Sequence, residues 1–248
     1  TKLYRDLLQV TEKTVGYAVW VEWELREWWP PDGSVLQWFV IAEIRTQLLH
    51  FLALTRQVVD QTERRVLRDE KVPATDKLFS IFEPHTDIIV KGGRDSEFGH
   101  KVFLTTGKSG LVLDCQVLKG NPADSTLVEQ FLERHVEIYG TSPREVAFDG
   151  GFTSRDNLKY LKKNGVQDAA FHKKRGLEVH EMVRSSSLYR DLTRFRAGVE
   201  AGISFLKRCF GLTRCMWRGF ESFVAYTWAS ALTSNLLVLA RHRLARET

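Results

Sequence analysis

The chain has 248 residues, of which 43% are hydrophobic, and it carries a formal net charge of +5. This length can bury the core of one large domain, with or without a helical appendage, and the modest positive charge permits a polyanionic partner without requiring one. Three cysteines are too few and too scattered for a disulfide framework or a zinc site, so we expect free thiols in a reducing cytosol.

Residues 1–75 are predicted to form an N-terminal helical region. A first helix is expected to end near Trp29, where Pro30-Pro31-Asp32-Gly33 interrupts it, and a second is expected from about Leu36 to Lys71. The chain starts without Met in what is predicted to be mid-helix, so we expect a fragment with sequence missing upstream.

Short strands are predicted from residue 77 onward. Antiparallel strands followed by alternating helices and strands are the order of a ribonuclease H-like mixed sheet. The sequence therefore predicts an α/β fold of this class, flanked by helices, over residues 76–248. The expected strands are 78–82, 87–91, 100–106, 111–118, 145–149 and 166–171, with a turn at Gly92-Gly93 and helices over 125–139 and 154–165 before a final helix that bears Glu200.

An uncharged run over residues 223–240 is long enough to cross a membrane. Its serines, threonines and Asn235 make it polar for lipid, so we expect a buried core helix and no membrane association.

The helix over FRAGVEAGISFLKRCFG places one acid between two bases in the pattern Arg196-x3-Glu200-x6-Lys207. Arg196 and Glu200 are i,i+4 neighbours, and Lys207 lies two turns beyond on nearly the same side. An ordinary solvated face is the alternative interpretation. However, residues 172–215 contain ten Lys and Arg against four acids, and such a basic region suits contact with a nucleic-acid backbone.

A second carboxylate, Asp149, follows a predicted buried strand, where α/β sheets commonly place functional residues. Gly150 and Gly151 would let a phosphate backbone or a metal approach closely, although a simple Asp-Gly turn is the alternative. A two-metal phosphoryl-transfer site needs about three carboxylates from separate elements and no side-chain nucleophile. Asp95, Asp114 and Asp124 are weaker candidates, since Asp124 is predicted to cap a helix and Asp114 lies mid-strand.

Together these motifs resemble the bacterial insertion-sequence transposases of the DDE type. The resemblance covers roughly residues 77–242 and rests on FDGGF at 148–152, on the Arg196-x3-Glu200-x6-Lys207 helix, and on the FEPHTD, GHKV and GNPADS stretches. The family pattern reads Tyr-x2-Arg-x3-Glu-x6-Lys, and this chain has Thr193 at the tyrosine position. Phe195 and Tyr189 are the candidates to replace that ring.

The resemblance implies a set of metal ligands. Asp149 would be the second and Glu200 the third ligand of two Mg²⁺ ions, for which Mn²⁺ could substitute. Asp87 is expected to be the first, with Glu83 as the alternative. The cations expected to contact DNA are Arg196, Lys207, Lys173, Lys174, Arg175 and Arg208.

The resemblance also implies an activity, namely metal-dependent DNA cleavage at transposon ends and strand transfer to target DNA. A homo-oligomer on DNA is expected, in the bacterial cytoplasm at the nucleoid, with the upstream helix-turn-helix missing from this chain. Two alternatives stay open: a nuclease of the same fold without joining activity, and a non-catalytic DNA-binding remnant of a decayed element.

Overall fold

The computed structural model describes residues 2–89 and 96–247, which form two compact units, 1–99 and 100–248. Each unit is described by itself. The predicted boundary between residues 75 and 76 stays a prediction. The turn at Gly92-Gly93, residues 90 and 91 of a predicted strand, and Asp95 lie outside the described residues.

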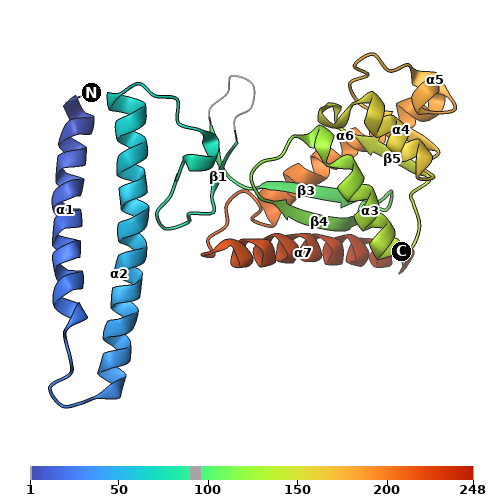
Figure 1. Ribbon diagram of the computed structural model, residues 1–248. Coiled ribbons are helices and arrows are strands. Elements are labelled where there is room, and N and C mark those ends of the chain that lie inside the picture. The colour runs from blue at the N-terminus through green and yellow to red at the C-terminus, as the bar shows by residue number, and fades with distance from the viewer. Residues whose placement is uncertain (1, 90–95, 248) are drawn as a thin grey trace. The chain divides into compact units, whose positions relative to one another are not determined.

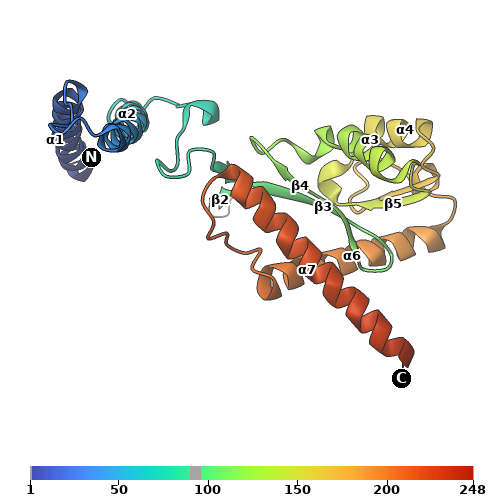
Figure 2. The same cartoon turned by 90° about the horizontal axis from the view of Figure 1, so that it is seen from below.

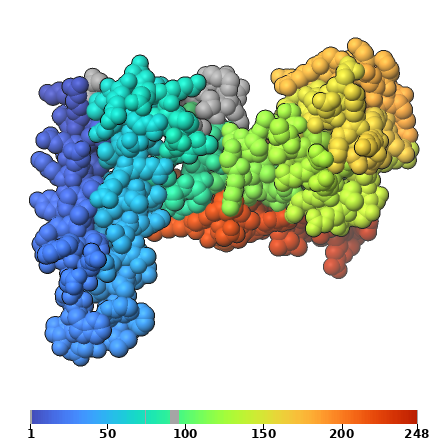
Figure 3. Space-filling model, viewed as in Figure 1, coloured from blue at the N-terminus to red at the C-terminus, as the bar shows by residue number. Residues whose placement is uncertain are grey.

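The first unit is built on a helical hairpin in which α1 (Lys2–Arg26) lies beside α2 (Val35–Thr62) (Figures 1 and 3). This confirms the two predicted helices: α1 is slightly shorter than expected, and α2 continues directly into a π-helical turn, Glu63–Leu67. Ser34 begins α2 by accepting a hydrogen bond from the Gln37 amide at 3.4 Å. The less exposed positions recur every three or four residues, the spacing of a narrow helix-helix seam. In α1 they are Leu8, Thr11, Val15, Ala18, Glu22 and Leu25. In α2 the same spacing runs through Ile41, Arg45, Leu48, Leu52, Thr55, Val59 and Thr62, and the neighbouring Ala42, Phe51, Leu54, Val58 and Gln61 are also half-buried.

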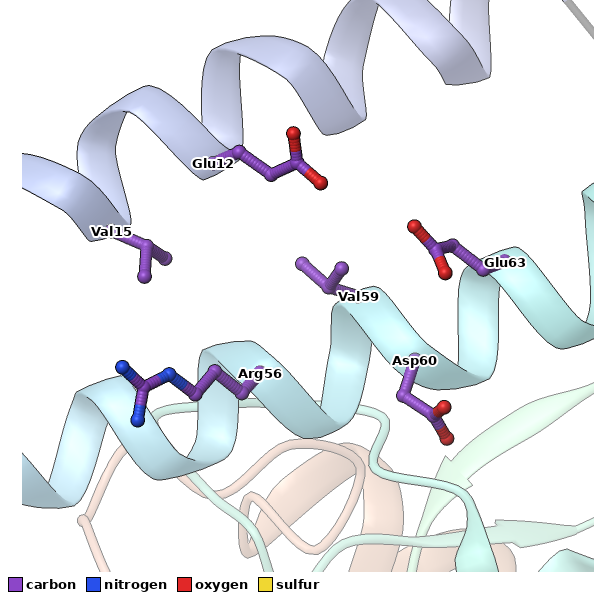
Figure 4. Close-up of a pocket in the computed structure, with 6 residues that line it drawn as sticks. All are labelled: Glu12, Val15, Arg56, Val59, Asp60 and Glu63. Atoms are coloured by element: carbon purple, nitrogen blue, oxygen red, sulfur yellow. The ribbon is translucent and has the colours of Figure 1, made fainter.

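The interface between α1 and α2 contains charged side chains as well as apolar ones. Arg45 of α2 contacts Glu22 of α1 at 2.6 Å, which ties the two helices together inside the seam. Further along, a shallow hollow between the helices is lined mainly by charged side chains (Figure 4). No residue that the sequence indicates as functional lines this hollow; its lining is Glu12, Val15, Arg56, Val59, Asp60 and Glu63.

The predicted strand over 78–82 is wrong. The backbone of Leu78 is instead held by a side chain, because the Gln61 amide donates to its carbonyl at 2.7 Å and accepts from its N–H at 2.8 Å. Leu78 is therefore bound to α2 through its backbone, its side chain is buried, and residues 78–82 form no strand. The prediction at 87–91 is confirmed in part by β1 (Asp87–Ile89), which pairs antiparallel with β2 (Glu97–Gly99), a strand that was not predicted.

The second unit is a mixed α/β layer structure. The strands β3 and β4 pair antiparallel, whereas β5 and β6 pair parallel. Helices α3 and α4 lie on one face of these strands, and α6 and α7 lie on the other (Figure 2). The elements are β3 (Lys101–Thr106), β4 (Val112–Leu118), α3 (Val128–Tyr139), β5 (Glu145–Phe148), α4 (Arg155–Lys163), β6 (Asp168–Phe171), α5 (Val179–Met182), α6 (Ser186–Cys209) and α7 (Phe220–Glu247).

The order of strands and helices agrees with the predicted α/β class. A continuous ribonuclease H-like sheet is not confirmed, since the described strands form three separate two-stranded ladders. The main core lies between the strands and α3, α4 and α6, where Val128, Leu161 and Phe171 are fully buried. Each such side chain contributes roughly 1.5–3 kcal/mol by leaving water, and this core fixes the ends of β5 and β6.

The expectation that residues 223–240 form a buried core helix is wrong in one respect. By length and composition α7 could cross a membrane, but only 22% of its most apolar window is buried. Its inner face packs on β4, where the Asn235 amide bonds both the N–H and the carbonyl of Val112 at 2.8 Å. Its outer face leaves Trp228 and Leu232 exposed. Asn235 thus serves the contact with β4, whereas Ser230 donates to the Phe210 carbonyl and Thr233 to the Ala229 carbonyl of α7 itself.

Candidate active site

Asp149 stands directly after β5, as the sequence predicts. Its Oδ1 accepts a hydrogen bond from the Gly150 amide at 2.5 Å and so begins a short 3-10 turn, Gly150–Phe152. Because β5 and β6 run parallel, the residues that follow both strands meet at one edge, and the His172 amide donates to the Phe148 carbonyl at 3.1 Å. The Asp149 side chain is 54% exposed at this edge.

The two glycines after Asp149 are required by close neighbours. A Cβ at Gly150 would lie 2.6–2.9 Å from carbons of the Lys173 side chain. A Cβ at Gly151 would meet the carboxyl group of Asp124, whose own Cβ would be 3.1 Å away. The Asp-Gly-Gly sequence therefore lets a basic loop and a second acid pack against the Asp149 turn.

Helix α6 carries Arg196 and Glu200 to the same edge. Ser185 begins the helix by accepting a hydrogen bond from the Leu188 amide at 3.2 Å, and the helix packs against both β5 and β6. A single nitrogen of Arg196, Nη2, lies 3.1 Å from Asp149 Oδ1 and 2.6 Å from Glu200 Oε1. Two of the three predicted metal ligands are thus brought together on one cation.

Burial within this triplet is uneven. The Arg196 side chain is 16% exposed, whereas the Glu200 carboxylate is 61% exposed. Arg196 also borders a small space together with Ala147, Ala170 and Thr193. Both acids are more than half exposed and are therefore accessible to a ligand from solvent.

Thr193, the departure from the family tyrosine, bonds its hydroxyl back to the Tyr189 carbonyl at 2.8 Å. The Tyr189 hydroxyl in turn donates to the Phe171 carbonyl at 2.9 Å. Tyr189 therefore supports the packing of α6 on β6. A DNA contact by Phe195 or Tyr189 stays a prediction.

The predicted DNA-binding cations fall into two groups apart from Arg196. Lys173, Lys174 and Arg175 are exposed in the loop after β6, and Arg175 has a left-handed φ of 45°. Lys207 and Arg208 are exposed in the last turn of α6. Their contact with DNA stays a prediction.

Asp114 is a structural acid. It is buried and receives two hydrogen bonds from Arg134, at 2.6 and 3.1 Å, with others from Gln116 and the Cys115 amide. Burial raises the pKa of the Asp114 carboxyl, but these hydrogen bonds outweigh it, so the pKa is lower than usual. The pair joins β4 to α3.

The prediction that Asp124 caps a helix is wrong, since its carboxylate accepts from Lys101 at 2.9 Å and packs on Gly151. Sequence reasoning missed Asp168, which is 1% exposed and pairs with Arg184 at 3.3 Å. Asp168 begins β6 and so lies at the opposite end of the strands from Asp149. Its only signal in the sequence is a charge in a strand of otherwise apolar residues.

The candidates for the first metal ligand lie in the first unit. Glu83 contacts His85 at 2.7 Å, and Asp87 begins β1 opposite Gly99. Within residues 2–89 and 96–247 no three His, Cys, Asp or Glu side chains are grouped closely enough to hold a metal ion. The choice between Asp87 and Glu83, and the meeting of either with Asp149 and Glu200, stay predictions.

A comparison with protein families matches residues 58–236 to the family described as the transposase DDE domain. The chain belongs to this family. The match includes Glu83, Asp87, Asp149 and Glu200 and confirms the DDE-type transposase domain that the motifs indicate. No curated protein and no solved structure matches the chain. In this transposase domain the edge that holds Asp149, Arg196 and Glu200 is the candidate active site.

Proposed function

We propose that this DDE transposase domain cleaves DNA at transposon ends and transfers the 3′ hydroxyl to a target phosphodiester in a reaction that needs Mg²⁺. The observation that carries the proposal is the shared contact of Asp149 and Glu200 with one nitrogen of Arg196. Acids from a strand end and from a helix 51 residues later in the chain are joined here, in a chain that belongs to the transposase DDE domain family.

The donor set suits a divalent cation. Mg²⁺ prefers carboxylate oxygens, and the side chains of Asp149 and Glu200 are 54% and 61% exposed. An oxygen of each acid already contacts the Arg196 guanidinium, which occupies the position that we propose for the metal cation. Asp87 is proposed as the further ligand, with Glu83 as the alternative. Bound there, a metal pair would activate the attacking hydroxyl and stabilise the leaving oxygen.

The protein supplies position and charge for the DNA. The exposed loop Lys173, Lys174 and Arg175 begins at the strand edge that bears Asp149, and its Lys173 side chain packs on Gly150. Lys207 and Arg208 extend the basic surface along α6. Contacts from these cations to phosphates would hold the scissile strand in register with the acids, without regard to sequence. Action as a homo-oligomer on DNA in the cytoplasm, at the nucleoid, belongs to the same proposal.

The test is a strand-transfer assay with purified protein, Mg²⁺, and a duplex that ends in the DNA flanking this coding sequence, pre-cleaved to expose its 3′ hydroxyl. Joined products are expected, and hydrolysis alone would indicate a nuclease. Binding without either reaction would indicate a non-catalytic remnant. Glu200→Gln is expected to abolish the reaction and largely spare DNA binding, with Glu221→Gln, on another helix, as the matched control.

A further inference from the structure

The position of Arg196 has a consequence for metal binding. A cation that binds Asp149 Oδ1 and Glu200 Oε1 must compete with the Arg196 Nη2, which lies 3.1 and 2.6 Å from these two oxygens. A guanidinium and a divalent ion cannot share these oxygens without strong repulsion, because both are positive and the distances are short.

The contact differs from an ordinary surface ion pair. Exposed pairs contribute little, since water screens both groups. Arg196 is 16% exposed and is held by two acids, one on its own helix and one on the turn after β5. Arg194, two residues away, is the contrast: its side chain is 81% exposed and its nearest acid, Asp191, is 3.7 Å away.

We propose that Arg196 is an internal counter-cation that occupies the two acids until a metal and DNA replace it. It is a positioning residue: it keeps Asp149 and Glu200 close to one another in the absence of metal, and it lowers their affinity for the metal. A phosphate that draws the guanidinium away would free the acids. Metal and DNA would then bind cooperatively, each raising the affinity for the other by the same factor.

This inference rests on the proposed function, because it takes Asp149 and Glu200 as metal ligands. It is tested on DNA-free protein by titrating Mn²⁺ and following the loss of the free-ion signal by electron paramagnetic resonance. Arg196→Gln is expected to bind Mn²⁺ at least tenfold more tightly than the original chain, about 1.4 kcal/mol. Arg194→Gln removes the same charge from the same helix and is expected to leave the affinity within about twofold, since its charge is screened.

The outcomes distinguish the counter-cation role of Arg196 from the metal site at Asp149 and Glu200. Equal affinities in Arg196→Gln and Arg194→Gln would overturn the counter-cation role, while weaker Mn²⁺ binding in Glu200→Gln would leave the metal site standing. Unchanged Mn²⁺ binding in Glu200→Gln would overturn both. A second measurement uses the original chain and follows the Arg196 side-chain Nε–H resonance by NMR. Mg²⁺ should shift this resonance. An unmoved resonance at saturating Mg²⁺ would contradict the proposal.

Discussion

Replacement of Arg134 by Met removes the partner of Asp114, the acid that is buried between β4 and α3. Arg134 makes two hydrogen bonds to Asp114, whose side chain is 9% exposed, while its own is 37% exposed. Breaking a fully buried pair costs about 3–5 kcal/mol, and the partial exposure of Arg134 reduces this to about 2–4 kcal/mol. Thermal unfolding is therefore expected to shift down by roughly 5–12 °C.

The stability lost in Arg134→Met should depend on pH. In the original chain the lowered pKa of Asp114 stabilises the fold above the carboxyl's ordinary pKa, and this contribution is lost as the pH falls through the lowered value. Without Arg134, burial dominates and raises the pKa, so acidification from neutral pH should restore part of the lost stability. Urea unfolding of both proteins from pH 7 to pH 4 measures this. If Arg134→Met lowers the free energy of unfolding by less than about 1 kcal/mol, or if both proteins have the same pH profile, the Arg134–Asp114 pair does not stabilise the fold in this way.

Three further predictions concern the site and the core. Lys207→Ala should weaken DNA binding and lower the slope of log K against log salt by about 1, with Lys163→Ala as the matched control; an unchanged slope in a filter-binding series would count against a phosphate contact. Gly150→Ala should cost about 1–3 kcal/mol in urea unfolding, because its Cβ would lie 2.6 Å from the Lys173 side chain, and an undisturbed variant would contradict this packing. Burial and the nearby Asp114 charge raise the pKa of Cys115 to about 12, so its thiol should react with a maleimide at neutral pH only after unfolding, and rapid labelling in the native state would be the contrary result.

Much of the site is predictable from local pattern. Asp149 follows a short apolar strand and precedes two glycines, and Glu200 lies on a helix with clear apolar spacing. The i,i+4 spacing also predicts the contact between Arg196 and Glu200. Its second contact, with Asp149, joins residues far apart in the chain and depends on how α6 crosses β5. The sequence does not reveal this second contact, and the DNA contact expected of Arg196 stays a prediction.

The errors in the fold have the same origin. The apolar residues of 78–82 suggest a strand, but the backbone of Leu78 bonds to the Gln61 side chain of α2. The lack of charge over 223–240 suggests burial on all sides, whereas the Asn235 amide shows which single face meets β4. In both cases a contact with a residue distant in the sequence determines the local structure, and the local sequence pattern does not reveal that contact.

A metal site at Asp149 and Glu200 is tested most directly by a crystal structure of the protein grown with Mn²⁺ and recorded at a wavelength where manganese scatters anomalously. We expect an anomalous peak in contact with carboxylate oxygens of both Asp149 and Glu200, with the Arg196 guanidinium moved off them. The same map would show whether Asp87 or Glu83 supplies the further ligand. If saturating Mn²⁺ gives no peak between Asp149 and Glu200, and Arg196 is still bound to both, these acids do not form the metal site.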